Sequence, residues 1–189
     1  VKLAGMPDLS TRPVRMVFTS RAGGVSAAPY DSFNLAAHVG DNPEDVAANR
    51  SRLARILGLP TDRFVWMEQL HTNTVTPVDA PSAAPVEATD ALVTREKNLA
   101  LCVLVADCTP VLLSDHAAGV IGAAHAGRMG ARNGIVKNTV QAMVDLGAQP
   151  SRIQVLMGPA AAGASYEVPE AMAADVEKHL PGSRTTTTR

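Results

Sequence analysis

The stretch Leu99–Gly127 reads LALCVLVADCTPVLLSDHAAGVIGAAHAG and decides the fold of this chain. Its apolar runs are long enough for buried β-strands, but none approaches the roughly 18 residues needed to cross a bilayer. Together with the apolar segment just before it, the stretch predicts closely spaced strands at Ala91–Thr94, Leu99–Ala106, Val111–Ser114 and Val120–Ala124. The middle of the chain is therefore expected to form a β-sheet.

Helices are predicted on both sides of these strands. Asn42 can cap a helix that has Pro43 at its first position, and Gly58 provides the stop signal. Two later helices are expected, one from about Ala131 to Leu146 and one over Pro169–Leu180.

The other segments are divided between strands and loops. Strands are expected at Val14–Thr19, Phe64–His71 and Ile153–Met157, and loops at Thr76–Pro85 and Gly158–Gly163. Strands with interspersed helices predict an α/β or α+β fold. A length of 189 residues suits a single domain that covers residues 1–189.

The composition excludes several classes of function. A formal net charge of −1 without basic runs argues against general binding to nucleic acid or to an anionic membrane. We expect no signal peptide at the start of the chain, although its first residue is Val and not Met. Cys102 and Cys108 would lie about 20 Å apart on one strand, too far for a disulfide. We therefore expect a reduced, cytoplasmic protein.

Three side chains could form a metal site: His71, Cys108 and His125. Each lies at the end of a predicted strand, where side chains converge at an edge of the sheet. Two imidazoles and one thiolate are preferred zinc ligands, and they leave a fourth tetrahedral position open for water or substrate. Their spacings fit no compact zinc-finger pattern, so spacing alone is a weak signal.

Two other interpretations use the same residues. A cysteine after an apolar strand is commonly a core residue, and a histidine at a strand end is commonly a surface residue. Composition alone favours this structural interpretation for any one of the three. Alternatively, Cys108 is a nucleophile activated by His71 or His125 without any metal. The three residues by themselves leave these alternatives open.

Eight short motifs are spread along the chain from Val14 onward. They are SRAGGVS at Ser20–Ser26, YDSFNLAAHVGD at Tyr30–Asp41, NR at Asn49–Arg50, EQLH at Glu68–His71, TDALV at Thr89–Val93, ADCTPV at Ala106–Val111, AHAGRMG at Ala124–Gly130 and MGPAAAGASYEV at Met157–Val168. In this order they resemble the YfiH/YlmD family, also called the laccase-domain or multicopper polyphenol oxidase family. Each motif is weak alone, but eight in the family's order are specific.

The resemblance implies mixed β-sheets layered with helices, in a fold similar to that of a deamidating bacterial toxin of the CNF type. It implies that His71, Cys108 and His125 hold zinc, with copper possible. It also implies a purine nucleoside phosphorylase that acts with phosphate on adenosine, inosine, guanosine or methylthioadenosine and also deaminates adenosine. The alternatives are a Cys/His hydrolase or amidase that edits cell-wall precursors, and a copper-dependent polyphenol oxidase. One His–Cys–His set cannot supply the several copper sites that an oxidase needs.

Other residues are candidates for substrate contacts. Arg21 and Gly24 could hold a phosphate through a guanidinium and backbone N–H groups, although composition alone favours an ordinary turn. His38 lies in a family motif and is expected to line the site. Asp107 adjoins Cys108 and is expected to orient an imidazole or to accept a proton.

The chain departs from the family pattern in two places. Many members have HAGWRG where this chain has HAGRMG, so Arg128 is the candidate to contact an anionic substrate group in place of the family's arginine. Relatives usually continue for several tens of residues, so the domain is expected to be truncated after Arg189. The oligomeric state and the preferred nucleoside do not follow from the sequence.

Overall fold

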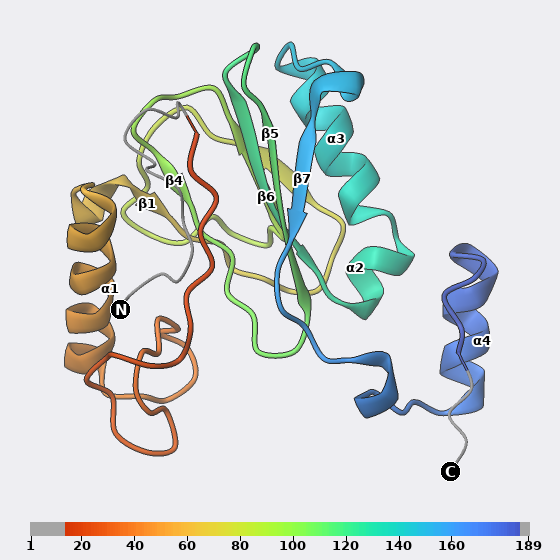
Figure 1. Ribbon diagram of the computed structural model, residues 1–189, viewed down its shortest axis with the longest axis horizontal. Helices are drawn as coiled ribbons and strands as arrows, with labels where there is room; N and C mark the ends of the chain where they lie inside the picture. The colour runs from red at the N-terminus through yellow and green to blue at the C-terminus, as the bar shows by residue number, and fades with distance from the viewer. Residues whose placement is uncertain (1–13, 186–189) are drawn as a thin grey trace.

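A five-stranded mixed sheet forms the centre of the fold in the computed structural model, which describes residues 14–185 (Figure 1). Its strands are β2 (Val75–Pro77), β3 (Ala91–Thr94), β5 (Thr109–Asp115), β6 (Val120–Ala126) and β7 (Gln154–Met157). The spatial order is β2-β3-β6-β5-β7. The pair β2–β3 is parallel and the other pairs are antiparallel.

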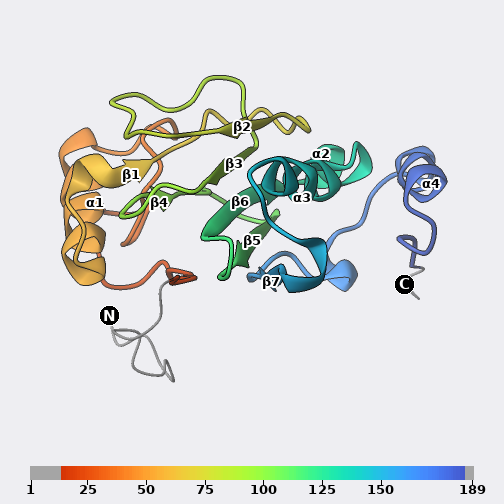
Figure 2. The ribbon, with the colours of Figure 1, turned by 90° about the horizontal axis from the view of Figure 1, so that it is seen from above.

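Smaller layers lie on the two sides of this sheet (Figure 2). A two-stranded parallel sheet of β1 (Phe64–Val65) and β4 (Ala100–Leu101) lies on one side, with α1 (Pro43–Leu57) beyond it. On the other side lie α2 (Arg128–Arg132) and α3 (Ile135–Asp145), and α4 (Glu170–His179) stands farthest out. Mixed sheets layered with helices confirm the predicted fold class.

Both faces of the central sheet are apolar. On the α3 face, strand residues such as Val93 and Val111 pack with Ile135 and Met143 of the helix. On the other face, Leu92 packs against residues that include Val65 of β1. Each fully buried aliphatic side chain contributes about 1.5–3 kcal/mol to folding. Burial on both faces therefore fixes the position of β6, which lies between β3 and β5.

The residues predicted to begin and end α1 do so in the structure. The Asn42 side-chain oxygen accepts a hydrogen bond from the Glu44 N–H at 2.9 Å, and Pro43 is the first helical residue. Gly58 ends the helix with φ 68°, a left-handed conformation that glycine adopts without steric cost.

The predicted helix from Ala131 to Leu146 is instead two helices. α2 begins earlier, directly after Gly127, and α3 follows a break at Gly134. Gly134 has φ 84°, which the interior of a right-handed helix cannot contain. The break lets α2 follow the end of β6 while α3 turns back along the sheet.

Three predicted strands are shorter than expected or absent. Val14–Thr19 forms no strand, Phe64–His71 is a strand only over β1, with an isolated bridge from Met67 to Val86, and Leu99–Ala106 is a strand only over β4. Beyond β1, the Gln69 side chain takes over the pairing: its Nε2 donates to Leu104 O at 2.7 Å, and its Oε1 accepts from Leu104 N at 2.8 Å. A side chain thus replaces the backbone ladder at this point.

The remaining predictions agree more closely with the structure. β3 has the predicted bounds, β5 and β6 extend the predicted strands, and β7 and α4 lie within the predicted ranges. The predicted loop Thr76–Pro85 is wrong at its start, because Thr76 and Pro77 belong to β2. Cys102 and Cys108 are both free, as expected. Of the helices in residues 14–185, none has the length and apolar character that a bilayer span requires.

Asp115, at the end of β5, is a fully buried carboxylate that anchors the chain around it. It accepts hydrogen bonds from the backbone N–H groups of Ala117, Ala118 and Gln149, and from the Arg152 guanidinium at 2.8 Å. The bonds from Arg152 and from Gln149 hold the pKa of the Asp115 carboxyl well below its usual range. Asp115 should therefore stabilise the fold in its ionised form.

We expect Asp115→Asn to lower the free energy of unfolding at pH 7. Because the folded-state pKa is depressed, this stabilisation is present above the unfolded-state pKa of about 3.9 and is lost as the pH falls toward the folded-state value. Urea denaturation should show a difference between wild type and variant that is largest at pH 7 and shrinks below about pH 4. The exposed Asp79, changed to Asn, is the control. A difference that does not vary with pH would contradict this role.

Candidate metal centre

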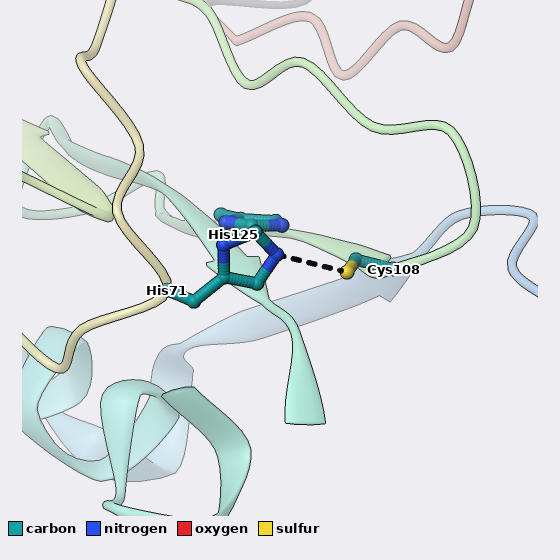
Figure 3. A group of neighbouring side chains, drawn as sticks. All are labelled: His71, Cys108 and His125. Carbon is teal, nitrogen blue, oxygen red and sulfur yellow. Dashed lines mark hydrogen bonds between the residues drawn. The ribbon is translucent and has the colours of Figure 1, made fainter. Parts of the chain in front are cut away.

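The ligand atoms of His71, Cys108 and His125 all lie within 4.8 Å of one another (Figure 3). Cys108 Sγ is 3.7 Å from His71 Nε2, and the two imidazole rings meet edge to face with their centroids 4.7 Å apart. His125 is buried, Cys108 is partly buried and His71 is exposed. The structure thus brings the three predicted ligands together at a place that solvent reaches from the His71 side.

Strand pairing places two of these residues side by side. β5 and β6 are antiparallel, and their register sets Pro110 opposite His125 and Thr109 opposite Ala126. Cys108 directly precedes β5, so it lies beside the residues at the end of β6. His71 arrives from the loop between β1 and β2. The site is therefore built from three chain segments that are distant in sequence.

Asp90, just before β3, joins the two histidines. Its carboxylate is fully buried and lies 2.8 Å from His125 Nδ1. It also accepts hydrogen bonds from the backbone N–H groups of Leu70, His71 and Thr72, and from the Thr72 hydroxyl. The residue-by-residue reasoning missed Asp90, although it belongs to the TDALV motif that the family resemblance had marked.

The charges around the cluster favour a cation. Burial alone would raise the pKa of the Asp90 carboxyl, but hydrogen bonds from His125 and Thr72 outweigh it and hold the pKa below its usual value. The pKa of the Cys108 thiol is raised, first by burial and then by the neighbouring Asp107 and by Asp90. A metal ion would oppose this effect because it favours the thiolate.

Gly127 leaves room beside the three ligands. A Cβ at this position would lie 2.7 Å from His71 Cδ2 and 3.0 Å from Cys108 Sγ. The backbone of Gly127 is extended, with φ −71°, so the need for glycine here comes from space and not from conformation.

The donor set fits a zinc ion with an open coordination position. His125 Nδ1 is engaged by Asp90, so its Nε2 is the nitrogen left for a metal, and His71 presents Nε2 toward Cys108. Imidazole nitrogen and thiolate sulfur are both zinc ligands, and three protein ligands with an open fourth position are the pattern of catalytic zinc sites. The second imidazole nitrogen of such a ligand commonly donates to a carboxylate, as Asp90 allows here.

The predicted phosphate cradle uses its donors within its own loop. Arg21 Nε donates to Asp31 O at 2.9 Å and Nη2 to Asp31 Oδ2 at 3.2 Å, while Gly24 N donates to Ser32 Oγ at 3.1 Å. A Cβ on Gly24 would lie 2.0 Å from Ser32 O, so close packing explains the glycine. A substrate role for Arg21 and Gly24 stays a prediction.

Arg128, Asp107 and His38 are the remaining residues that the sequence predicts to serve the site. Arg128 is the first residue of α2, directly after Gly127, and is partly buried, with Nη1 3.2 Å from Met129 Sδ. Asp107 is exposed and contacts the Cys108 thiol, while the His125 ring is held by Asp90, so the role expected for Asp107 stays a prediction. His38 is exposed in the loop before α1. Substrate roles for Arg128 and His38 stay predictions.

Solved structures share this fold. YlmD from Geobacillus stearothermophilus matches with a TM-score of 0.82 and 34% identity over 88% of this chain and 65% of its own. YfiH from Bacillus licheniformis matches with a TM-score of 0.80 and 31% identity over 87% of this chain and 64% of its own. The chain thus spans less than two thirds of either solved structure, and its fold defines a protein of the YlmD and YfiH class.

The family model of the multi-copper polyphenol oxidoreductase laccase matches residues 15–189, and the chain belongs to this family. This confirms the resemblance expected from the motifs. A protein of Corynebacterium glutamicum named purine nucleoside phosphorylase is 66% identical over 184 residues, which cover 96% of this chain and 75% of that protein. One of Mycobacterium tuberculosis with the same name is 55% identical over 174 residues, which cover 92% and 70%.

We expect Gly127→Ala to weaken zinc binding about tenfold or more, because the added methyl group would displace His71 or Cys108 from the cluster. Competition for zinc with a chromogenic chelator measures this affinity. Gly163→Ala is a matched control, since among residues 14–185 its Cβ would meet only Thr185 Oγ1, at an ordinary contact distance of 3.9 Å. Unchanged zinc affinity in a folded Gly127→Ala variant would show that the metal does not lie among these three residues.

Proposed function

We propose that this chain carries the active site of a zinc-dependent purine nucleoside phosphorylase that also deaminates adenosine. The observation that carries the proposal is the convergence of the His71, Cys108 and His125 ligand atoms within 4.8 Å. The relatives from Corynebacterium glutamicum and Mycobacterium tuberculosis are named purine nucleoside phosphorylase, which supports the phosphorylase part of the proposal. The substrates are adenosine, inosine, guanosine or methylthioadenosine, with inorganic phosphate as the second substrate.

In phosphorolysis, a phosphate oxygen forms a bond to C1′ of the ribose while the C1′–N9 bond breaks. The bonding electrons go to the purine, which then takes up a proton, and the products are the free base and ribose 1-phosphate. In deamination, water replaces the amino group at C6 of adenosine and ammonia leaves. A zinc ion bound at the cluster would supply Lewis-acid chemistry, which stabilises developing negative charge and favours loss of a proton from water.

The protein groups supply position and charge. His71, Cys108 and His125 would hold the metal, and Asp90 would hold the His125 ring in place. Arg128 is the closest of the predicted cationic residues in sequence to the cluster, and it is our candidate for the contact with phosphate. Arg21 and Gly24 are the second candidate, because their N–H groups would first have to leave Asp31 and Ser32.

A hydrolase or amidase that uses Cys108 as a nucleophile is the second candidate function. The distance of 3.7 Å between Cys108 Sγ and His71 Nε2 favours it, because an imidazole could take the thiol proton. The raised pKa of the Cys108 thiol argues against it, since less thiolate is then present at neutral pH. A copper-dependent oxidase comes third, since residues 14–185 contain one such ligand group and an oxidase needs several copper sites.

Removal of the metal separates the first two candidates. We expect a chelator to abolish the turnover of adenosine and inosine and to make Cys108 react with alkylating reagents, because its thiolate is then no longer bound. Mass spectrometry of alkylated peptides and release of the free base measure the two effects.

Cys102 is an internal control for this experiment. Burial raises the pKa of the Cys102 thiol to about 12, so it should react slowly with or without metal. Full activity in a metal-free sample, together with rapid loss on alkylation of Cys108, would overturn the zinc mechanism in favour of the hydrolase.

The phosphate requirement is a separate test of the reaction. Inosine should give hypoxanthine and ribose 1-phosphate only when phosphate is present, whereas release of ammonia from adenosine should not need phosphate. Base release at the same rate without phosphate would indicate hydrolysis of the glycosidic bond and would contradict a phosphorylase.

A further inference from the structure

We propose that Asp90 is a positioning residue that prepares both histidines of the cluster for metal binding. It orients the ring of His125 and the backbone of His71 through one buried carboxylate. The part of this inference that concerns metal binding rests on the proposed function. The effect of Asp90 on the His125 ring does not need a metal.

The first step is the contact with His125. Asp90 Oδ1 is 2.8 Å from His125 Nδ1, and both side chains are almost completely shielded from solvent. A carboxylate accepts hydrogen bonds, so Nδ1 must carry the proton. In the neutral imidazole Nε2 is then unprotonated, and only an unprotonated nitrogen can bind a metal. Asp90 therefore selects the tautomer in which His125 offers Nε2 as a ligand.

The second step is the loop that carries His71. The backbone N–H groups of Leu70, His71 and Thr72 donate to the Asp90 carboxylate at 3.2, 3.0 and 2.7 Å. His71 has φ 60°, in the left-handed region that residues with a side chain rarely adopt. Such a conformation persists where the surroundings hold it. The three hydrogen bonds to Asp90 hold His71 in this conformation, and they direct the His71 ring toward Cys108.

The third step is the rigidity of Asp90 itself. Its backbone N–H donates to Thr74 O at 3.1 Å, and its carbonyl oxygen accepts from His125 N at 2.7 Å. The backbone is thus tied both to the segment that follows His71 and to β6. The backbone that carries the carboxylate is fixed relative to both segments, so the carboxylate has a defined position from which to hold the His125 ring and the His71 backbone.

The test compares Asp90→Asn with wild type. The asparagine amide would donate to His125 Nδ1, which moves the ring proton to Nε2 and blocks the metal-binding nitrogen. We expect zinc affinity to fall about 10- to 100-fold, the usual effect of losing such a partner. Chelator competition measures the affinity, and ¹⁵N chemical shifts of the His125 ring in metal-free protein report which nitrogen is protonated.

Asp115→Asn is the matched control. Asp115 is also fully buried and also accepts several backbone N–H groups, but it lies at the opposite end of β5 from Cys108. It should lose stability while its folded form keeps wild-type zinc affinity and the wild-type His125 tautomer. The same loss of affinity in both variants would reduce the role of Asp90 to general stability and would overturn the proposal.

The two proposals fail in different ways. If the ring of His125 in wild-type, metal-free protein is protonated at Nε2 and not at Nδ1, the role of Asp90 is wrong whether or not Asp90→Asn folds. Wild-type zinc affinity in folded Asp90→Asn would also overturn it while leaving the zinc site intact. If wild-type protein binds no zinc but His125 carries its proton on Nδ1, the zinc mechanism fails and the effect of Asp90 on the ring stands.

Discussion

The antiparallel pairing of β5 with β6 is the constraint on which the rest of the structure depends. β6 is the central strand, and its small residues let neighbouring layers come close: a Cβ on Gly122 would lie 3.2 Å from both Met143 Sδ and Thr139 Cγ2 of α3. Once the layers are packed in this way, the register of the pair cannot slip without turning buried side chains toward solvent. This fixed register is what holds Cys108 beside the end of β6, so core packing also determines the geometry of the candidate site.

Local signals were sufficient to predict much of the fold, and the errors arose where long-range contacts decide. The limits of α1 follow from Asn42, Pro43 and Gly58, whose effects are confined to neighbouring residues. The length of the strand after Phe64 could not be predicted in this way, because Gln69 pairs through its side chain with Leu104, which is 35 residues away. The sequence likewise shows that Gly134 can adopt unusual backbone conformations, but it does not show that two helices must diverge there.

For the candidate site too, the sequence motifs identified some residues and missed one whose role depends on long-range contacts. Spacing did not identify His71, Cys108 and His125 as one group; the motifs did, and the structure brings the three together. Asp90 was missed because its importance depends on what surrounds it: an aspartate before a strand is ordinary in sequence, and only the folded chain sets His125 and three backbone N–H groups around it. Proximity to Cys108 along the chain pointed to Asp107 as a partner for an imidazole, and it could not point to Asp90 as well.

The origin of the cluster in three distant segments has a thermodynamic consequence. An unfolded chain does not hold these side chains near one another, so an ion bound at the cluster binds the native state in preference to the unfolded state. The concentration of free ion then becomes a determinant of protein stability: at a hundred times the dissociation constant, the native state gains about 2.7 kcal/mol. Metal supply and protein abundance in the cell would in this way be linked through the three side chains of the cluster.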